Sequence, residues 1–181
     1  MDSAARREFE ESTRGLVGLR LTGVRYVDLG DDDPRPRFDL RSEFDSMDYG
    51  LELVGDGGRV VGLEWTDRFD VWCGVWIVEG GIGKVGRAVW DVSERSRWSS
   101  MVGRCLTHVE VHWVDLESHE RTKYVLPYSL ELQFESDRVW IAAVEVAHTR
   151  DDYFLLRMTS HITVAFDEGA ASEYGLLPLP N

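Results

Sequence analysis

Long apolar runs are missing from this sequence. No window approaches the roughly 18 to 20 consecutive apolar residues that a membrane-spanning helix needs. The first eight residues, Met1 to Glu8, are largely polar and are not followed by the apolar core of a secretory signal. We therefore expect a soluble, cytoplasmic protein with no membrane partner. Apolar residues still make up 43% of the 181 residues, which is enough for a packed core in one or two domains.

Basic residues are scarce. The chain has 20 of them against 33 acidic residues, so its formal net charge is -13, and only Lys84 and Lys123 are lysines. Binding to the phosphates of nucleic acids requires a basic surface, so a nucleic-acid partner is disfavoured. An anionic membrane surface is disfavoured for the same reason. The charge fits a soluble protein, or one whose protein partner is basic.

Cysteine is also rare. Cys73 and Cys105 lie in strand-like apolar runs, and neither has a second cysteine at the spacing of a CxxC motif. A zinc or redox motif of that type is therefore absent. We expect two reduced thiols that pack as small apolar side chains, although a disulfide between them stays open until distances are known.

The familiar catalytic and nucleotide-binding motifs are missing too. The sequence contains no GxSxG, no P-loop and no GxGxxG after a strand. The glycine-rich segment 80–84 has no Walker spacing and no helical pattern behind it, so we expect a hairpin turn there. These absences favour a non-catalytic protein without a cofactor.

An internal repeat is the clearest pattern that is present. Residues 17–24 reappear as residues 102–109 with five of eight positions identical, and residues 49–53 reappear as residues 128–132. An Arg-Val pair follows residues 49–53 and residues 128–132 at the same distance. These pairs are Arg59-Val60 and Arg138-Val139. A period of roughly 80 residues is longer than that of a solenoid. The repeat predicts two tandem copies of one unit, residues 1–92 and 93–181, packed about an approximate two-fold axis.

The local patterns predict an all-β protein with a short N-terminal helix. Residues 3–14 can form a surface helix docked by Phe9 and Leu16. In residues 128–134 apolar and polar side chains alternate, as in a half-buried strand. Some ten strands joined by turn signals indicate an antiparallel sandwich or barrel. The expected strands are 19–29, 49–54, 59–65, 71–79, 84–92, 105–116, 124–134, 139–147, 153–158 and 162–166. A short helical turn at 98–101 would take the place that the N-terminal helix has in the first copy.

The first candidate site is a possible metal centre at His108, Glu110 and His112. Alternate residues of a strand share a face, and two imidazoles with a carboxylate are a common ligand set for iron and zinc. However, the three positions span about 13 Å on a straight strand. One ion therefore needs two neighbouring members plus a residue from another strand. The alternatives are a metal-dependent enzyme and a solvent-facing strand surface.

The second candidate site is a pair of tryptophans, Trp72 and Trp76. Among the seven tryptophans these two fall on one face of the same predicted strand, with only Gly74 between them on that face. An exposed aromatic pair can stack on a sugar ring or a protein partner. The alternative is a strand that is buried on both faces.

The third candidate site is an acidic loop over residues 31–48. The acidic residues that we single out as partner-binding are Asp31, Asp32, Asp33, Asp45 and Asp48. Their spacing does not match a calcium-binding EF-hand loop, and nearby arginines compete for the carboxylates. A solvated, partly ion-paired loop and a docking surface for a basic protein both fit the pattern.

The function that we expect is recognition of a protein partner by a non-catalytic module, with binding of a small ligand or carbohydrate as the alternative. In its general composition the chain is similar to small bacterial accessory proteins such as toxin-neutralising immunity proteins. This similarity lies in size, acidity and strand content, without a shared motif.

Overall fold

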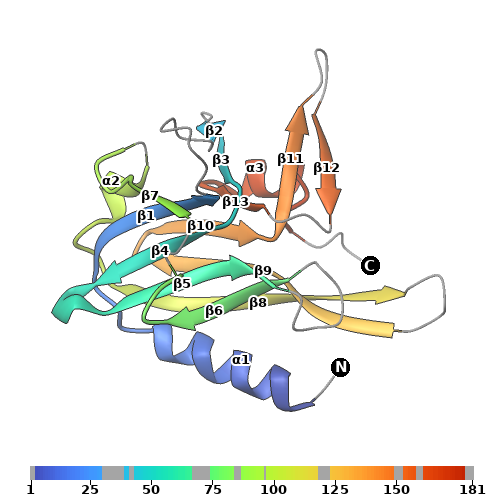
Figure 1. Cartoon of the computed structure of the whole chain (residues 1–181), viewed down its shortest axis with the longest axis horizontal. Helices are drawn as coiled ribbons and strands as arrows, with labels where there is room; N and C mark the ends of the chain where they lie inside the picture. The colour runs from blue at the N-terminus through green and yellow to red at the C-terminus, as the bar shows by residue number, and fades with distance from the viewer. Residues whose placement is uncertain are drawn as a thin grey trace.

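The computed structural model describes residues 3–29, 39–40, 43–66, 74–83, 87–95, 97–117, 123–148, 153–157 and 161–177. Within these residues the chain forms two large antiparallel sheets, a separate hairpin and short helices (Figure 1). The prediction of an antiparallel all-β fold with a short N-terminal helix is confirmed, and of the two predicted architectures, sandwich and barrel, the two sheets fit the sandwich. No helix of the described part is long and apolar enough to cross a membrane.

The first sheet has five strands in the order β6-β5-β4-β1-β7 within the described residues. The strands are β1 (Leu21–Leu29), β4 (Gly50–Gly55), β5 (Val60–Trp65), β6 (Val75–Glu79) and β7 (Arg87–Asp91). The glycine-rich connection between β4 and β5 contains a single 3-10 turn, η1 (Asp56–Gly58). The predicted strands 49–54 and 59–65 therefore form an antiparallel hairpin. The hairpin turn predicted at residues 80–84 is wrong, because β6 and β7, which flank this segment, lie at opposite edges of the sheet.

The second sheet has six strands in the order β2-β3-β13-β10-β9-β8 within the described residues. The strands are β2 (Asp39–Leu40), β3 (Phe44–Met47), β8 (Leu106–Glu117), β9 (Lys123–Phe134), β10 (Asp137–Ala142) and β13 (Ile162–Ala165). Because β2 and β3 come from the first half of the chain, the two halves are interleaved. The proposed units 1–92 and 93–181 stay a prediction.

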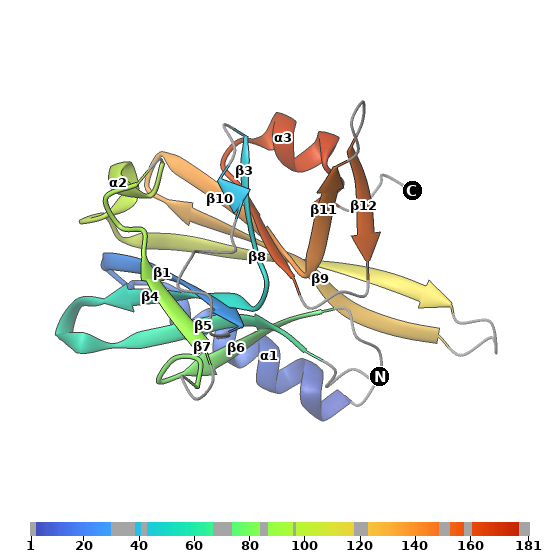
Figure 2. The same cartoon turned by 45° about the horizontal axis from the view of Figure 1, so that its top comes forward.

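A hairpin of β11 (Val144–His148) and β12 (Tyr153–Arg157) projects from the second sheet (Figure 2). The sequence predicts one strand over 139–147, whereas the structure divides this segment at Ala143. The chain leaves the sheet at that residue and then forms the hairpin before it returns as β13.

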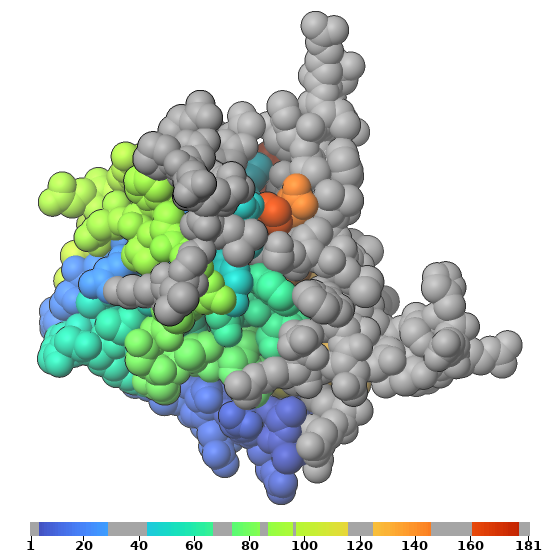
Figure 3. Space-filling view, in the orientation of Figure 1, coloured from blue at the N-terminus to red at the C-terminus, as the bar shows by residue number. Residues whose placement is uncertain are grey.

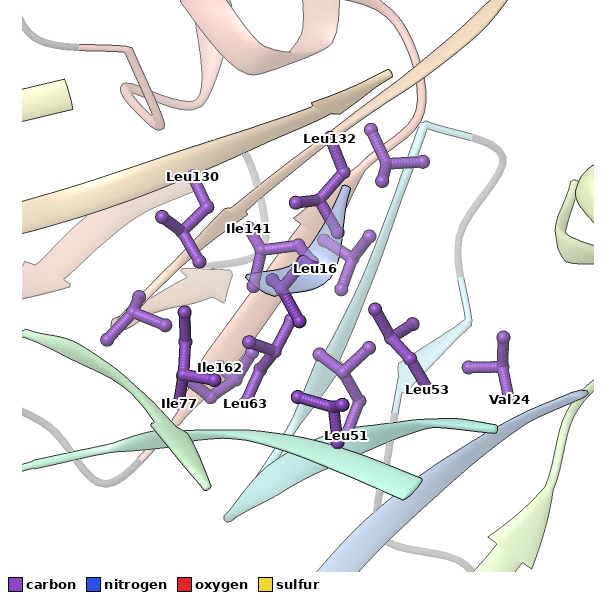
Figure 4. Close-up of a cluster of buried hydrophobic side chains, with 14 of the residues drawn as sticks. Leu16, Val24, Leu51, Leu53, Leu63, Ile77, Leu130, Leu132, Ile141 and Ile162 are labelled. Atoms are coloured by element: carbon purple, nitrogen blue, oxygen red, sulfur yellow. The ribbon is translucent and has the colours of Figure 1, made fainter. Parts of the chain in front are cut away.

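Leucine, isoleucine and valine side chains fill the space between the two large sheets. Leu51 and Leu53 alternate with the outward Glu52, and Leu130 and Leu132 alternate with Glu131. Burying one such side chain contributes about 1.5–3 kcal/mol relative to leaving it exposed. Figure 4 shows side chains of the two sheets facing each other, among them Leu51, Leu53, Leu63, Leu130, Leu132 and Ile141.

Helix α1 (Ser3–Leu16) covers the side of the sandwich where β6 and β8 are the outermost strands (Figure 1). Phe9 is fully buried there, with its ring centroid 5.6 Å from that of Trp76 on β6 and 5.9 Å from that of Trp113 on β8. The Arg6 guanidinium lies 4.4 Å from the centre of the Trp113 ring. The predicted docking of the helix by Phe9 and Leu16 is borne out, since both are fully buried.

The two blocks of the first sequence repeat pair with each other. Four backbone hydrogen bonds of 2.7–2.8 Å join residues 18–21 to residues 103–106 in antiparallel fashion. Gly18 N donates to Leu106 O, and the corresponding Gly103 N donates to Leu21 O. Both glycines have a φ of 92°, a conformation that side chains with a Cβ disfavour. Helix α2 (Trp98–Met101) precedes Gly103 as α1 precedes Gly18, as predicted.

The correspondence continues along the strands. The order β6-β5-β4-β1 in one sheet matches β13-β10-β9-β8 in the other. Both β1 and β8 have a register shift at a threonine, Thr22 or Thr107, whose hydroxyl donates to a carbonyl oxygen of the neighbouring strand at 3.1 or 3.0 Å. The structure therefore contains a repeated four-stranded arrangement, and its origin in a duplication stays a prediction.

One detail of the predicted repeat is shifted. Val61 lies opposite Leu53, and Val139 lies opposite Leu132, so Val61 and Val139 are equivalent in the sheets. The sequence match instead aligns Val60 with Val139. The reason is that Val61 follows its partner Leu53 by eight residues, whereas Val139 follows its partner Leu132 by seven.

A second, smaller core lies on the outer face of the six-stranded sheet. Helix α3 (Glu168–Glu173) covers this face, and the ring centroids of Tyr174 and Phe44 are 4.9 Å apart. The sequence patterns do not predict this helix, since the last expected element is the strand at 162–166. Asp167 caps the helix, with its Oδ1 accepting a hydrogen bond from Ala170 N at 2.8 Å.

Candidate functional site

His108, Glu110 and His112 share one face of β8, as the sequence predicts. Val109, Val111 and Trp113 pack against the main core, while His108 and Glu110 are exposed and His112 is half-buried. The alternation expected from the sequence is therefore correct. The three polar residues lie opposite Gln133, Glu131 and Ser129 of β9, respectively.

Glu131 of the neighbouring strand β9 lies close to His112. The distance between His112 Nε2 and Glu131 Oε2 is 3.9 Å, and the side chains are 16% and 12% exposed. Trp140 Nε1 donates to Glu131 Oε2 at 3.1 Å, and Arg138 lies 3.3 Å from Oε1. His112, Ser129 and Glu131 together are called the β8–β9 cluster below.

Two polar atoms of the β8–β9 cluster are buried without a hydrogen-bond partner in the described part of the chain. They are His112 Nε2 and Ser129 Oγ, which belong to a directly opposed pair of residues. The Ser129 side chain is fully buried beside a β-bulge at Tyr128, whose hydroxyl donates to Gly175 O in the segment that follows α3. An unpaired buried polar atom costs about 1–3 kcal/mol.

The three residues His108, Glu110 and His112 do not form one compact ligand set. Within the described residues, no three side chains of His, Cys, Asp or Glu are gathered in a way that could hold a metal ion. His108 lies opposite Gln133, four residues along β8 from His112. A metal-dependent enzyme stays untested, and the structure adds Glu131, which the sequence analysis did not select as a candidate.

The repeat could have pointed to Glu131. Its equivalent in the first sheet, Glu52, is also a buried carboxylate on an outward face. Glu52 Oε1 accepts a hydrogen bond from Ile82 N at 2.9 Å, and Glu52 Oε2 pairs with Arg25 at 3.2 Å. The Tyr-x-Leu-Glu-Leu block thus places a buried acceptor in both sheets.

Of the predicted partner-binding residues, Asp31, Asp32 and Asp33 lie outside the described residues. Asp45 is 1% exposed on β3 and accepts a short hydrogen bond from the Tyr26 hydroxyl, which in turn accepts one from Trp98 Nε1 at 2.6 Å. Burial, followed by the charge of Asp45, raises the pKa of Tyr26 well above its ordinary value. In this arrangement Asp45 connects β3 to β1 and α2 inside the protein.

Asp48 lies at the end of β3 and is partly exposed. Its Oδ1 is 2.7 Å from His161 Nε2, and Glu145 Oε2 is 3.7 Å from His161 Nδ1. Asp48 N also donates to Asp28 Oδ1 at 3.4 Å. These contacts join the end of β3 to β1, β11 and the start of β13.

The described half of the tryptophan pair is buried. Trp76 is 4% exposed and packs on Phe9, while its neighbours Val75 and Ile77 are buried on the opposite face of β6. Trp72 lies outside the described residues, as does Cys73. The described part of this strand therefore fits the alternative of burial on both faces. Cys105 is a free, half-buried thiol.

An open polar groove lies where β1 begins and β7 ends. Its lining residues are Thr22, Asp91, Ser93, Glu94 and Arg95. Hydrogen bonds from Ser93, through both its side chain and its backbone, lower the pKa of Asp91. In Figure 3 the residues after β7 form the light green surface on the left of the molecule.

In comparisons with known proteins, no protein family, no curated protein and no solved structure matches this chain. The function therefore has to be argued from the residues themselves.

Proposed function

We propose that this protein is a non-catalytic binding module of the cytoplasm that recognises a basic protein partner through an acidic surface around residues 31–33. A role of the accessory or toxin-neutralising type fits this proposal. The observation that carries it is the excess of carboxylates, 33 against 20 basic residues.

The arginines do not offset this excess. Six arginines of the described chain are already held in ion pairs with carboxylates of the same chain: Arg6, Arg25, Arg59, Arg97, Arg104 and Arg138. Each pair uses one acidic and one basic group, so the surplus of 13 carboxylates is unchanged. Such a surplus attracts cationic partners and raises their association rate.

The acidic segment is connected to rigid elements at both ends. It follows β1, which pairs with β4 and β7, and it precedes β2, which pairs with β3. The buried Asp45 and the Asp48–His161 contact fix β3 in place. Loops attached to a rigid scaffold are the usual location of recognition residues. Asp45 and Asp48 would then support the binding surface, and Asp31, Asp32 and Asp33 would contact the partner.

The experiment compares two variants of equal charge. Reversal of Asp31, Asp32 and Asp33 to arginine changes the net charge from -13 to -7, because each reversal adds two charges. A control reverses three exposed residues elsewhere, Glu11, Asp115 and Glu173, with the same change. The wild-type protein first captures partners from an extract of its source organism, and association rates with the purified partner are then measured for all three proteins.

The proposal predicts that the loop variant associates at least about tenfold more slowly than wild type at low salt, and that this difference shrinks as salt rises. The control variant should lose much less. Equal slowing in both variants would mean that net charge alone sets the association rate, which contradicts a specific role for residues 31–33. An acidic or neutral partner would also contradict the proposal.

A further inference from the structure

We propose that the outer face of β8 and β9 binds a divalent transition-metal ion between His112 and Glu131. Glu110 is not gathered with these two residues in the structure and turns in as the third protein ligand when the ion binds. The site keeps two neighbouring members of the candidate set, Glu110 and His112, and Glu131 is the residue from another strand, in place of His108. It does not depend on the protein partner proposed above.

The first support is the unpaired imidazole nitrogen. His112 Nε2 is buried and has no hydrogen-bond partner in the described chain, and the fully buried Ser129 Oγ opposite it also has none. Native proteins leave few buried polar atoms in this condition, and a bound ion is one of the recognised reasons. A neutral imidazole nitrogen is a common metal ligand.

The second support is the distance between the two ligand atoms. Two atoms bonded to one tetrahedral ion at about 2.1 Å lie about 3.4 Å apart. His112 Nε2 and Glu131 Oε2 are 3.9 Å apart. Closing the site therefore requires a movement of only about half an ångström, which small side-chain rotations can supply.

The third support is the way in which Glu131 is held. Trp140 Nε1 donates to its Oε2 at 3.1 Å, and Arg138 lies 3.3 Å from its Oε1. Carboxylates that bind metals are usually held by hydrogen bonds of this kind, which fix their orientation. Because Arg138 engages the other oxygen and its side chain is 48% exposed, solvent screens its repulsion of an ion at Oε2.

The fourth support comes from comparison of the two sheets. In the first sheet Arg25 lies opposite Glu52 and forms an ion pair with it. At the equivalent positions of the second sheet, Glu110 lies opposite Glu131, so two carboxylates face each other across the strands. Like charges directly opposite each other are unfavourable, and a cation between them removes the repulsion. Glu110 is exposed, so its side chain has room to turn toward the ion.

The donor set indicates the class of ion. One imidazole nitrogen and two carboxylates suit Zn²⁺ and its spectroscopic substitute Co²⁺ better than Cu⁺, which prefers thiolates. Open positions around the ion would be taken by water.

The test is a titration of the full-length protein with Co²⁺, followed by visible absorption, and with Zn²⁺, followed by calorimetry. We expect one ion per chain, and at least a tenfold loss of affinity in His112→Ala and in Glu110→Gln. His108→Ala is the matched control on the same strand and should bind as wild type does. Because Glu131→Gln can disturb Trp140, a second variant, Trp140→Phe, tests the same carboxylate by removing its hydrogen-bond donor. Its metal affinity should fall about tenfold, while circular dichroism shows an intact fold.

Three results would overturn the proposal. The first is that the folded wild-type protein takes up no ion at metal concentrations up to roughly 1 mM; a dissociation constant of that size corresponds to a binding free energy of only about 4.1 kcal/mol. His112→Ala could bind as tightly as wild type. His108→Ala could lose as much affinity as His112→Ala, which would place the ion elsewhere on β8.

Discussion

Replacing Tyr26 by phenylalanine tests the buried link between β1, β3 and α2. The change removes one hydroxyl that donates to Asp45 and accepts from Trp98 Nε1, and all three residues are buried. A hydrogen bond to a charged group contributes about 1.5–3 kcal/mol, and an indole N–H left without this acceptor costs about 1–3 kcal/mol. Some of this loss is offset by the more apolar side chain. We expect a destabilisation of about 3 kcal/mol.

Urea unfolding followed by circular dichroism measures this loss at pH 7. The matched control is Tyr128→Phe, which removes a hydroxyl that donates to the neutral carbonyl oxygen of Gly175. Its expected cost is about 1 kcal/mol. If Tyr26→Phe destabilises the protein no more than Tyr128→Phe does, the Asp45 link does not contribute as argued.

The same residue gives the protein a dependence on alkaline pH. Burial raises the pKa of Tyr26 in the folded state above its ordinary value of 10.0. The unfolded chain therefore loses this proton first, so the stability contribution is complete below pH 10 and is lost as pH rises further. Above pH 10 the wild-type free energy of unfolding should fall more steeply than that of Tyr26→Phe, by up to about 1.4 kcal/mol per pH unit. Parallel curves for the two proteins would contradict the assigned cause.

Three further predictions concern the scaffold. Phe9→Ala should cost about 3–5 kcal/mol in urea unfolding, since the ring lies buried between Trp76 and Trp113, and a cost below about 1 kcal/mol would mean that α1 is not docked as described. Gly103→Ala should cost about 1–2 kcal/mol in thermal unfolding because of its φ of 92°, whereas the control Gly83→Ala, which has open space and no positive φ, should be close to neutral. Asp167→Ala should cost about 1 kcal/mol of stability at pH 7 through loss of the α3 cap. The hydrogen bond from Ala170 N lowers the pKa of Asp167, so the stability difference from wild type should vanish as the pH falls through this lowered pKa. A difference that stays constant with pH would exclude the cap.

Much of the fold was predictable, because the alternation of apolar and polar residues is local. The pattern around Leu130 and Leu132 identifies a strand and its buried face without knowledge of its neighbours. The location of β3 was not predictable, since its four residues, Phe44–Met47, have no alternating pattern and pair with β13, more than 100 residues away in sequence. Helix α3 has only six residues, and its one readable signal is the capping Asp167.

The candidate site divides in the same way. Glu110 and His112 are two residues apart, and side chains at this spacing share a face of a strand, so their common face is predictable from the sequence. The closeness of His112 to Glu131 depends on strand order and register, which a single sequence does not fix. Exposure is equally non-local. The sequence leaves open whether Trp76 is exposed or buried and gives no sign that Asp45 is buried, and both are buried in the structure.

Helix α1 has a consequence for solubility. It lies along the side of the sandwich where β6 and β8 are the outermost strands of their sheets. Exposed strand edges pair readily with other chains, and natural proteins often cover them with a helix. Removal of residues 3–16 would uncover two edges together with the aromatic side chains on which Phe9 packs. A chain shortened in this way would self-associate through β6 and β8, so the helix protects each molecule from its own copies.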